Sequence, residues 1–133
     1  MLGEVGVGNT TIAAALAAAL LEAPSDAVLG LGSGADAAMM ARKKRVVEAA
    51  LERSQGSRDV ATNRGERARL ALTQVGGPEV AVLAGVVLGA AEAHAPIVLD
   101  GLATSVAALA AARMEPSVQA YLVAGQRSRE SAH

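Results

Sequence analysis

The 133-residue chain has 12 Lys and Arg against 13 Asp and Glu, a formal net charge of −1 that provides no basic surplus for nucleic acid or an anionic membrane. It has no Cys, Trp or Phe, which excludes disulfides and thiolate metal sites and fits a reducing cytoplasm. Its length suits one domain over residues 1–133, but alanine dominates its apolar side chains and buries little surface, so we expect an oligomer or part of a larger assembly.

The opening loop has the glycine spacing of a phosphate-binding P-loop, Gly3-Glu4-Val5-Gly6-Val7-Gly8-Asn9-Thr10-Thr11, with Asn9 where the lysine belongs. Its glycines let backbone N–H groups surround a phosphate, and a following helix adds the positive end of its dipole. Without the lysine, a single phosphate monoester suits the loop better than ATP. The alternative is a flexible turn with Asn9 or Thr10 capping the helix.

Helices and polar connections follow the loop. Residues 11–21 predict a buried helix, and the glycine cluster at 28–34 predicts a loop. Residues 54–65 are polar without periodicity and predict a mobile connection. Between them, residues 36–53 predict an amphipathic helix whose apolar stripe is Met39, Met40, Val46, Val47, Ala50 and Leu51.

The second half of the chain alternates helices with two short strands. Helices are predicted over 66–74, 78–94 and 103–113, and the apolar run at 80–91 is too short to cross a bilayer. Residues 96–101 read as a buried parallel strand, and residues 121–125 as a second candidate strand. The expected fold class is therefore a helix-dominated, three-layer α/β arrangement of alanine-rich helices on a mostly parallel sheet.

Other charged residues suggest no separate site. The four basic residues at 42–45 are interpreted as a solvated helix face, whereas the role of the basic cluster from Arg58 to Arg69 is left open. His94 precedes a turn and is given no role. We predict no metal and no cofactor. Asp100 differs, because it ends the first predicted strand, where open α/β sheets bind ligands.

Five blocks occur in colinear order and carry a resemblance over essentially the whole chain. They are the opening loop, Ala41-Arg42-Lys43 with Val46-Val47-Glu48, Gly76-Gly77-Pro78-Glu79, Val98-Leu99-Asp100-Gly101 and Gly125-Gln126-Arg127-Ser128. This order resembles the nicotinate-nucleotide:dimethylbenzimidazole phosphoribosyltransferase family. Such enzymes exchange the nicotinate of nicotinate mononucleotide for a benzimidazole base, which gives the α-ribazole 5'-phosphate of the cobalamin lower ligand. The resemblance also implies a homodimer, and the absence of cysteine is the reason that we expect a cytoplasmic protein.

The resemblance assigns roles to residues of the matched blocks. It implies that Glu4 faces the reacting bases, that Lys43 contacts phosphate, and that Asp100 and Gly101 have a ribose or pocket-shaping role. The phosphate cradle would consist of Gly6, Gly8, Asn9, Thr10 and Thr11.

Each assignment has a plainer alternative. Glu4 would be an ordinary carboxylate near a helix N-terminus, Lys43 a surface charge and Asp100 a helix N-cap. Thr10 and Thr11 would only cap their helix.

The chain departs from the family pattern in three places. Ile12 stands where proline usually follows the two threonines, and Gln126 where histidine is common. A typical member is over twice as long and continues into a Leu-Gly-Glu-Gly motif with the proposed catalytic base, whereas this chain ends at His133. We therefore expect the chain alone to be weakly active or inactive.

Three functions stay open from the sequence: a phosphoribosyltransferase homologue, a non-catalytic phosphate-ester or nucleotide-binding module, and an assembly-only α/β domain. Preference for nicotinate mononucleotide over AMP and ATP favours the first, indifference among phosphates the second, and no binding the third.

Overall fold

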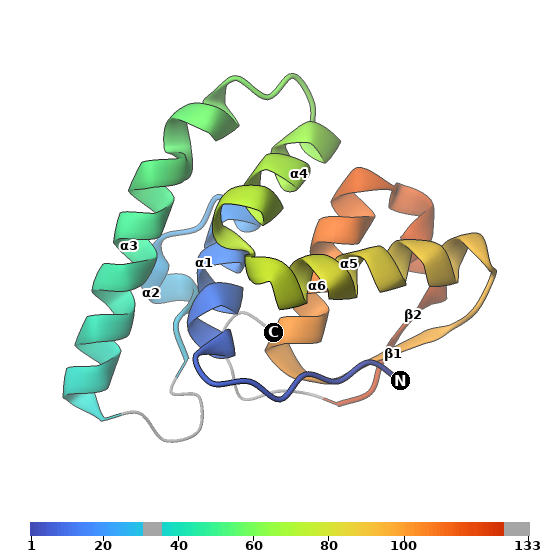
Figure 1. Ribbon diagram of the computed structural model, residues 1–133, viewed down its shortest axis with the longest axis horizontal. Helices are drawn as coiled ribbons and strands as arrows, with labels where there is room; N and C mark the ends of the chain where they lie inside the picture. The colour runs from blue at the N-terminus through green and yellow to red at the C-terminus, as the bar shows by residue number, and fades with distance from the viewer. Residues whose placement is uncertain (31–35, 127–133) are drawn as a thin grey trace.

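The computed structural model describes residues 1–30 and 36–126 and is dominated by helices (Figure 1). Part of the second glycine cluster and the Arg127-Ser128 end of the last block lie outside the described residues. The helices are α1 (Asn9–Leu21), α2 (Ser25–Val28), α3 (Ala37–Asp59), α4 (Arg64–Val75), α5 (Gly77–Glu92), α6 (Gly101–Met114) and the 3-10 helix η1 (Pro116–Tyr121).

Helix α1 lies at the centre of the molecule. Residues 13–20 are all buried, because the helix is apolar on every side and contacts α2, α3, α4 and α6. Six of those eight residues are alanine, whose small side chain lets neighbouring helices approach closely. The predicted buried helix is confirmed.

The core has two clusters of buried side chains, and α6 contributes to both. Leu102, Val106 and Ala110 pack with α1 and its neighbours. Ala108 and Ala111 belong to the second cluster, which also includes residues of α5, η1 and the first strand. Helix α6 therefore joins the helical bundle to the sheet.

The two strands, β1 (Ile97–Leu99) and β2 (Leu122–Ala124), pair in parallel, as predicted. Ile97 is the register partner of Leu122, and α6 with η1 forms the crossover between the strands. The Leu2 N–H donates to the Val98 carbonyl at 2.9 Å, so the start of the chain lies along β1. This contact anchors the opening loop to the sheet. The predicted helix-dominated α/β fold with a parallel sheet is confirmed.

The predicted connection at 54–65 is mostly helical in the structure. Helix α3 continues to Asp59 and α4 begins at Arg64, which leaves residues 60–63 between them. Local hydrogen bonds support this turn between the helices: the Asn63 side chain accepts from the Glu66 N–H, and the Thr62 N–H donates to the Glu66 carboxylate. Helices α2 and η1 were not predicted, since each spans two turns or fewer and has no apolar periodicity to detect.

The predicted apolar stripe of α3 is wrong in part. Met39 is 58% exposed and Val46 is 51% exposed, whereas Lys43, Val47 and Ser54 are buried. Positions 43, 47 and 54 share one helical face, and two of its three residues are polar. A search for apolar periodicity therefore places the inward face incorrectly.

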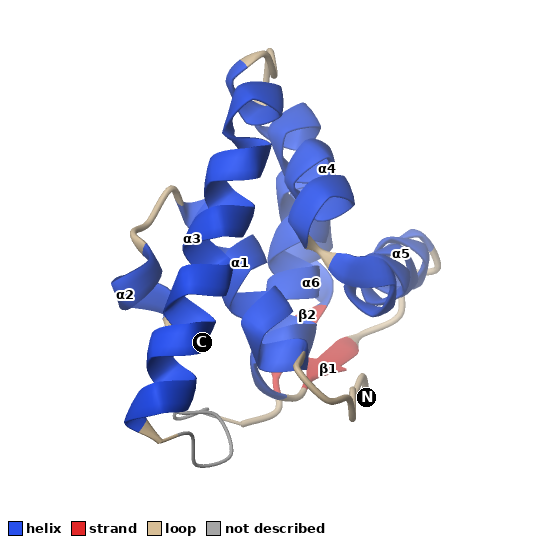
Figure 2. Cartoon of the chain, turned by 60° about the vertical axis from the view of Figure 1, so that its left-hand side comes forward, coloured by secondary structure: helices blue, strands red, loops and turns tan. Residues whose placement is uncertain are grey.

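Three helix N-termini and the carboxyl ends of both strands gather at one edge of the molecule. Helices α1, α3 and α6 all begin there, and the opening loop runs past the end of β1 to reach α1 (Figures 1 and 2). We call this the loop edge. Across the described ranges, no helix combines the length and apolar character needed to span a membrane.

Candidate functional site

The glycine-rich loop ends in an open helix N-terminus. Gly8 precedes α1 with φ of 85°, a left-handed conformation that glycine adopts without strain, and no side chain caps the helix there. The Gly8 carbonyl accepts from the Thr11 N–H at 3.0 Å. The first N–H groups of α1, on Asn9 and Thr10, have no acceptor within the helix. They point outward at the positive end of the helix dipole, which is the arrangement that binds anions.

Asn9 does not cap the helix, contrary to the plainer interpretation of the sequence. Its side-chain amide donates a hydrogen bond to the half-buried carboxylate of Glu4. That carboxylate lies over Gly6, where an added Cβ would overlap its oxygen. Gly6 therefore leaves the space that lets Glu4 fold back onto the loop and hold Asn9.

Lys43 of α3 places a positive charge at this helix end. Its ammonium group donates to the Thr10 hydroxyl at 3.2 Å and to the Gly30 carbonyl at 3.3 Å. Only 8% of Lys43 is exposed, so the alternative of a surface charge is wrong. Both partners of Lys43 are neutral, so a bound anion would complete its charge pairing.

The adjacent Lys44 has the opposite environment. It is a surface residue whose ammonium donates to the Asp26 carboxylate at 2.6 Å, and this bond raises the pKa of Lys44. Lys44 is thus a surface charge paired with a carboxylate, whereas Lys43 is a buried charge directed at the start of α1.

Asp100 and Gly101 stand at the carboxyl end of β1. Asp100 occupies the N-cap position of α6, as the alternative predicts, but its carboxylate makes no capping bond and instead accepts from the Gln126 side chain. The Asp100 N–H donates to the Thr104 hydroxyl at 2.8 Å. Gly101 has φ of 76°, which lets the chain turn sharply from strand to helix.

Close backbone approaches connect the remaining blocks. Gly125 donates to the Leu99 carbonyl at 2.9 Å, and a Cβ on Gly125 would lie 2.5 Å from that oxygen. Gly77 has φ of 70°, and a Cβ there would lie 3.3 Å from Ile12. The last two blocks are thus in direct contact, and Gly77 lies against the residue that follows the opening loop.

The predicted site residues form two groups. Glu4, Asn9, Thr10 and Lys43 belong to a connected set at the start of α1, and Asp100 belongs to a second set with Gln126. No hydrogen bond joins the two sets within the described ranges. Sequence reasoning missed the Gly30 carbonyl and Thr104, which have no motif of their own. Among the described side chains, no three His, Asp or Glu residues gather into a metal-binding group.

Comparisons with known proteins show the family of the chain. A family model described as phosphoribosyltransferase matches residues 1–133. The nicotinate-nucleotide–dimethylbenzimidazole phosphoribosyltransferase of Chloroflexus aurantiacus is 44% identical over 131 residues, which are 98% of this chain and 35% of that protein. The protein of the same name from Bradyrhizobium diazoefficiens is 42% identical over 133 residues, 100% of this chain and 36% of its own.

A solved structure gives the same result. The crystal structure of CobT from Thermus thermophilus matches with a TM-score of 0.85 and 40% sequence identity, over 98% of this chain and 37% of that chain. The chain thus spans little more than a third of the length of these relatives. Because the family model covers every residue, the chain belongs to this phosphoribosyltransferase family.

Proposed function

We propose that the chain carries the phosphate-binding part of an enzyme that exchanges the nicotinate of nicotinate mononucleotide for 5,6-dimethylbenzimidazole. The products are α-ribazole 5'-phosphate, for the lower ligand of cobalamin, and nicotinate. The observation that carries the proposal is the buried Lys43 ammonium beside Thr10 at the uncapped start of α1. The names of the relatives supply the reaction.

The loop suits one phosphate group. The open N–H groups of Asn9 and Thr10 would donate to its oxygens, and Lys43 would add a charge-assisted bond. Gly6 and Gly8 would let the phosphate approach the backbone, and Thr11 lies in the same helical turn. Nicotinate mononucleotide carries one such phosphate.

In the reaction, a benzimidazole nitrogen bonds to C1 of the ribose while the bond from C1 to the nicotinate nitrogen breaks, and its electron pair stays on nicotinate. The benzimidazole N–H proton passes to a base. Glu4 is the carboxylate next to the phosphate cradle and would face the reacting bases, and Asp100 with Gly101 would shape the ribose side. Fixing the phosphate end would orient C1 for the exchange.

The isolated chain should turn over weakly or not at all. A positioned base contributes roughly 10²–10⁴-fold to such a proton transfer. The family resemblance places that base in a Leu-Gly-Glu-Gly motif, which this sequence does not contain. Full turnover by the purified 133-residue chain, followed by release of nicotinate, would contradict this expectation.

Binding is the direct test of the loop. Nicotinate mononucleotide, AMP and ATP would be titrated against the chain by calorimetry, and we expect the mononucleotide to bind most tightly. Asn9→Asp should abolish binding, because it adds a negative charge at the cradle. The matched control is Asn63→Asp, which makes the same change at a helix start where aspartate is an equally good cap. Unchanged affinity in Asn9→Asp would remove the phosphate role of the loop.

We also propose that the enzyme works as a cytoplasmic homodimer. Large apolar side chains are exposed on two helices, Met39 and Val46 on α3 and Val82 and Val86 on α5, and such surfaces favour association. Sedimentation velocity of the chain should show a dimer, and a monomer at tens of micromolar would contradict the proposal.

A further inference from the structure

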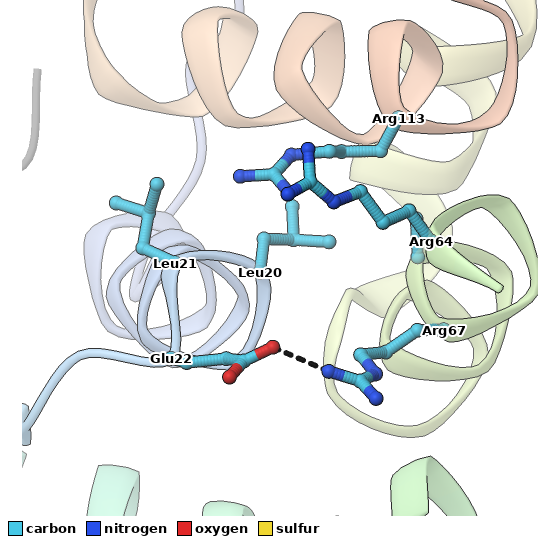
Figure 3. A pocket seen from close by; sticks show the side chains of 7 residues that line it. Leu20, Leu21, Glu22, Arg64, Arg67 and Arg113 are labelled. Atoms are coloured by element: carbon cyan, nitrogen blue, oxygen red, sulfur yellow. Dashed lines mark hydrogen bonds and ion pairs between the residues drawn. The ribbon is translucent and has the colours of Figure 1, made fainter.

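A cavity of about 370 Å³ lies at the end of α1 opposite the loop edge. Helix α1 has 13 residues, so this cavity is about 20 Å from the glycine-rich loop and cannot share its ligand. Three arginines reach it from two helices (Figure 3). We call this site the arginine pocket, and its lining residues are Leu20, Leu21, Glu22, Arg64, Arg67, Ala68 and Arg113.

Helix packing brings the arginines together. Arg113 is in the last turn of α6, and Arg64 and Arg67 are in the first turns of α4. Gly65 lets these helix ends approach closely, since an added Cβ would lie 3.4 Å from the Arg113 carbonyl oxygen. In Figure 3 the side chains of Arg64 and Arg113 extend toward the same space above Leu20.

The pocket has more positive charge than its own residues neutralise. Arg67 forms an ion pair with Glu22, whereas neither Arg64 nor Arg113 has an ion-pair partner among the residues that the structure describes. Three guanidinium groups and one carboxylate leave a local charge of +2. An anion of charge −2 would balance this pocket.

Local helix electrostatics explain only part of the cluster. Arg113 is favourable at the C-terminus of α6, where the helix dipole is negative. Arg64 is the first residue of α4, where the dipole is positive and a cation is disfavoured. The carboxylate of that turn, Glu66, accepts from Thr62. Arg64 is thus placed against its local preference, which is expected of a residue that binds a ligand.

We propose that the arginine pocket binds a phosphate group, as inorganic phosphate or as a phosphate monoester. A phosphate monoester carries about 1.5 to 2 negative charges at neutral pH, and inorganic phosphate carries more than one, so both match the charge of the pocket better than a carboxylate does. Guanidinium groups bind phosphate oxygens through paired N–H donors. Leu20, Leu21 and Ala68 form an apolar wall for the organic part of an ester, and the volume is within the range of small-molecule sites.

A residue-resolved NMR titration of the 133-residue chain with inorganic phosphate tests this proposal. Amide signals of residues 64–67 report on the arginine pocket, and those of residues 8–11 report on the loop, so failure at one site does not obscure the other. We expect saturable shifts at 64–67. Absence of saturable shifts there would overturn the proposal, whatever happens at the loop.

Substitutions distinguish specific binding by the pocket arginines from general attraction to positive charge. Arg64→Gln and Arg113→Gln should each weaken phosphate binding at 64–67 by roughly 10- to 100-fold, because each removes charged hydrogen bonds. Arg69→Gln is the matched control, since Arg69 is an exposed arginine of the same helix that does not line the pocket. An equal loss in all three variants would overturn the proposal.

Glu22→Gln should change the phosphate affinity in the opposite direction. Removing this carboxylate frees Arg67 and raises the local charge, so phosphate should bind more tightly. Weaker or unchanged binding in this variant would contradict the charge argument. Unfolding curves of all variants check that the fold is intact.

Ribose 5-phosphate, AMP and acetate distinguish the possible ligands. Tighter binding of an ester than of inorganic phosphate identifies a phosphate monoester site that uses the apolar wall. Equal affinities identify a site for the phosphate group alone. Acetate binding more tightly than phosphate would overturn the choice of a phosphate group.

Discussion

The two ends of α1 carry positive charge of different origin. At the loop edge it comes from open backbone N–H groups and from Lys43, which is buried and bonded to Thr10 and Gly30. At the other end it comes from three arginine side chains around Leu20 and Glu22. The first arrangement is fixed by the backbone and by the two hydrogen bonds that hold Lys43, whereas the exposed Arg64 side chain loses rotamer freedom when it binds a ligand. The loop should therefore be the more selective site, and the arginine pocket the more adaptable one.

Both ends depend on the same alanine-rich middle of α1. Residues 13–20 are buried on every side, so the helix has no solvent face along which it could shift. The position of the glycine-rich loop relative to Lys43, and of Glu22 relative to Arg67, follows from how closely α3 and α4 approach α1.

Leu16→Ala should have the largest effect, because it weakens the support of both ends together. Leu16 is fully buried, and leucine to alanine changes of this kind destabilise a protein by about 2–5 kcal/mol. The control is Leu21→Ala in the same helix, where the side chain is 45% exposed and the loss should be much smaller. Denaturant unfolding measures both, and similar losses would show that α1 is not the central support.

Lys43→Met should separate the two ends. It keeps an apolar stem of similar length but removes the charge at Thr10, so phosphate binding at the loop should fall by roughly 10- to 100-fold. Binding at the arginine pocket should not change. Lys44→Met, which removes the neighbouring surface charge, should leave both sites intact. The NMR titration with inorganic phosphate measures the affinity of both sites in both variants. A loss of binding at the loop in both variants would mean that Lys43 acts only through general charge attraction.

The fold was more predictable from sequence than the site. Uniform apolar character identified α1, and a short β-branched run between turns identified β1, since these signals are local. The inward face of α3 was misplaced because Lys43 and Ser54 are buried there, and burial of a polar residue depends on partners distant in sequence. The resemblance pointed to Lys43, yet its contacts with Thr10 and Gly30 join residues 33 and 13 positions apart, which no local pattern reveals.

The arginine pocket could not be predicted from the sequence either, because its residues are distant from one another along the chain. The sequence alone assigns no role to the basic cluster from Arg58 to Arg69, and Arg113 is far from it in the sequence. Only the packing of α4 on α6 at Gly65 brings Arg113 to Arg64. Composition gives the number of charged residues, whereas a pocket forms only where the fold brings their side chains together.

The smallest expected effect is a pH dependence confined to the arginine end. The Thr62 N–H and hydroxyl both donate to the Glu66 carboxylate, which lowers the pKa of Glu66. Because the folded-state pKa lies below the unfolded value, the stabilisation is complete above the unfolded pKa of about 4.3 and is lost as pH falls through the folded pKa. The protection factors of amides at the start of α4, which are corrected for the intrinsic pH dependence of exchange, should therefore fall as pH drops through the folded-state pKa of Glu66, while those at Gly8–Thr11 should not. Glu66→Gln should remove this difference. Glu115→Gln is the control, since bonds from Ser117 lower the pKa of Glu115 in the same way but outside α4. A loss of protection at α4 that persists in Glu66→Gln would assign the effect to another carboxylate.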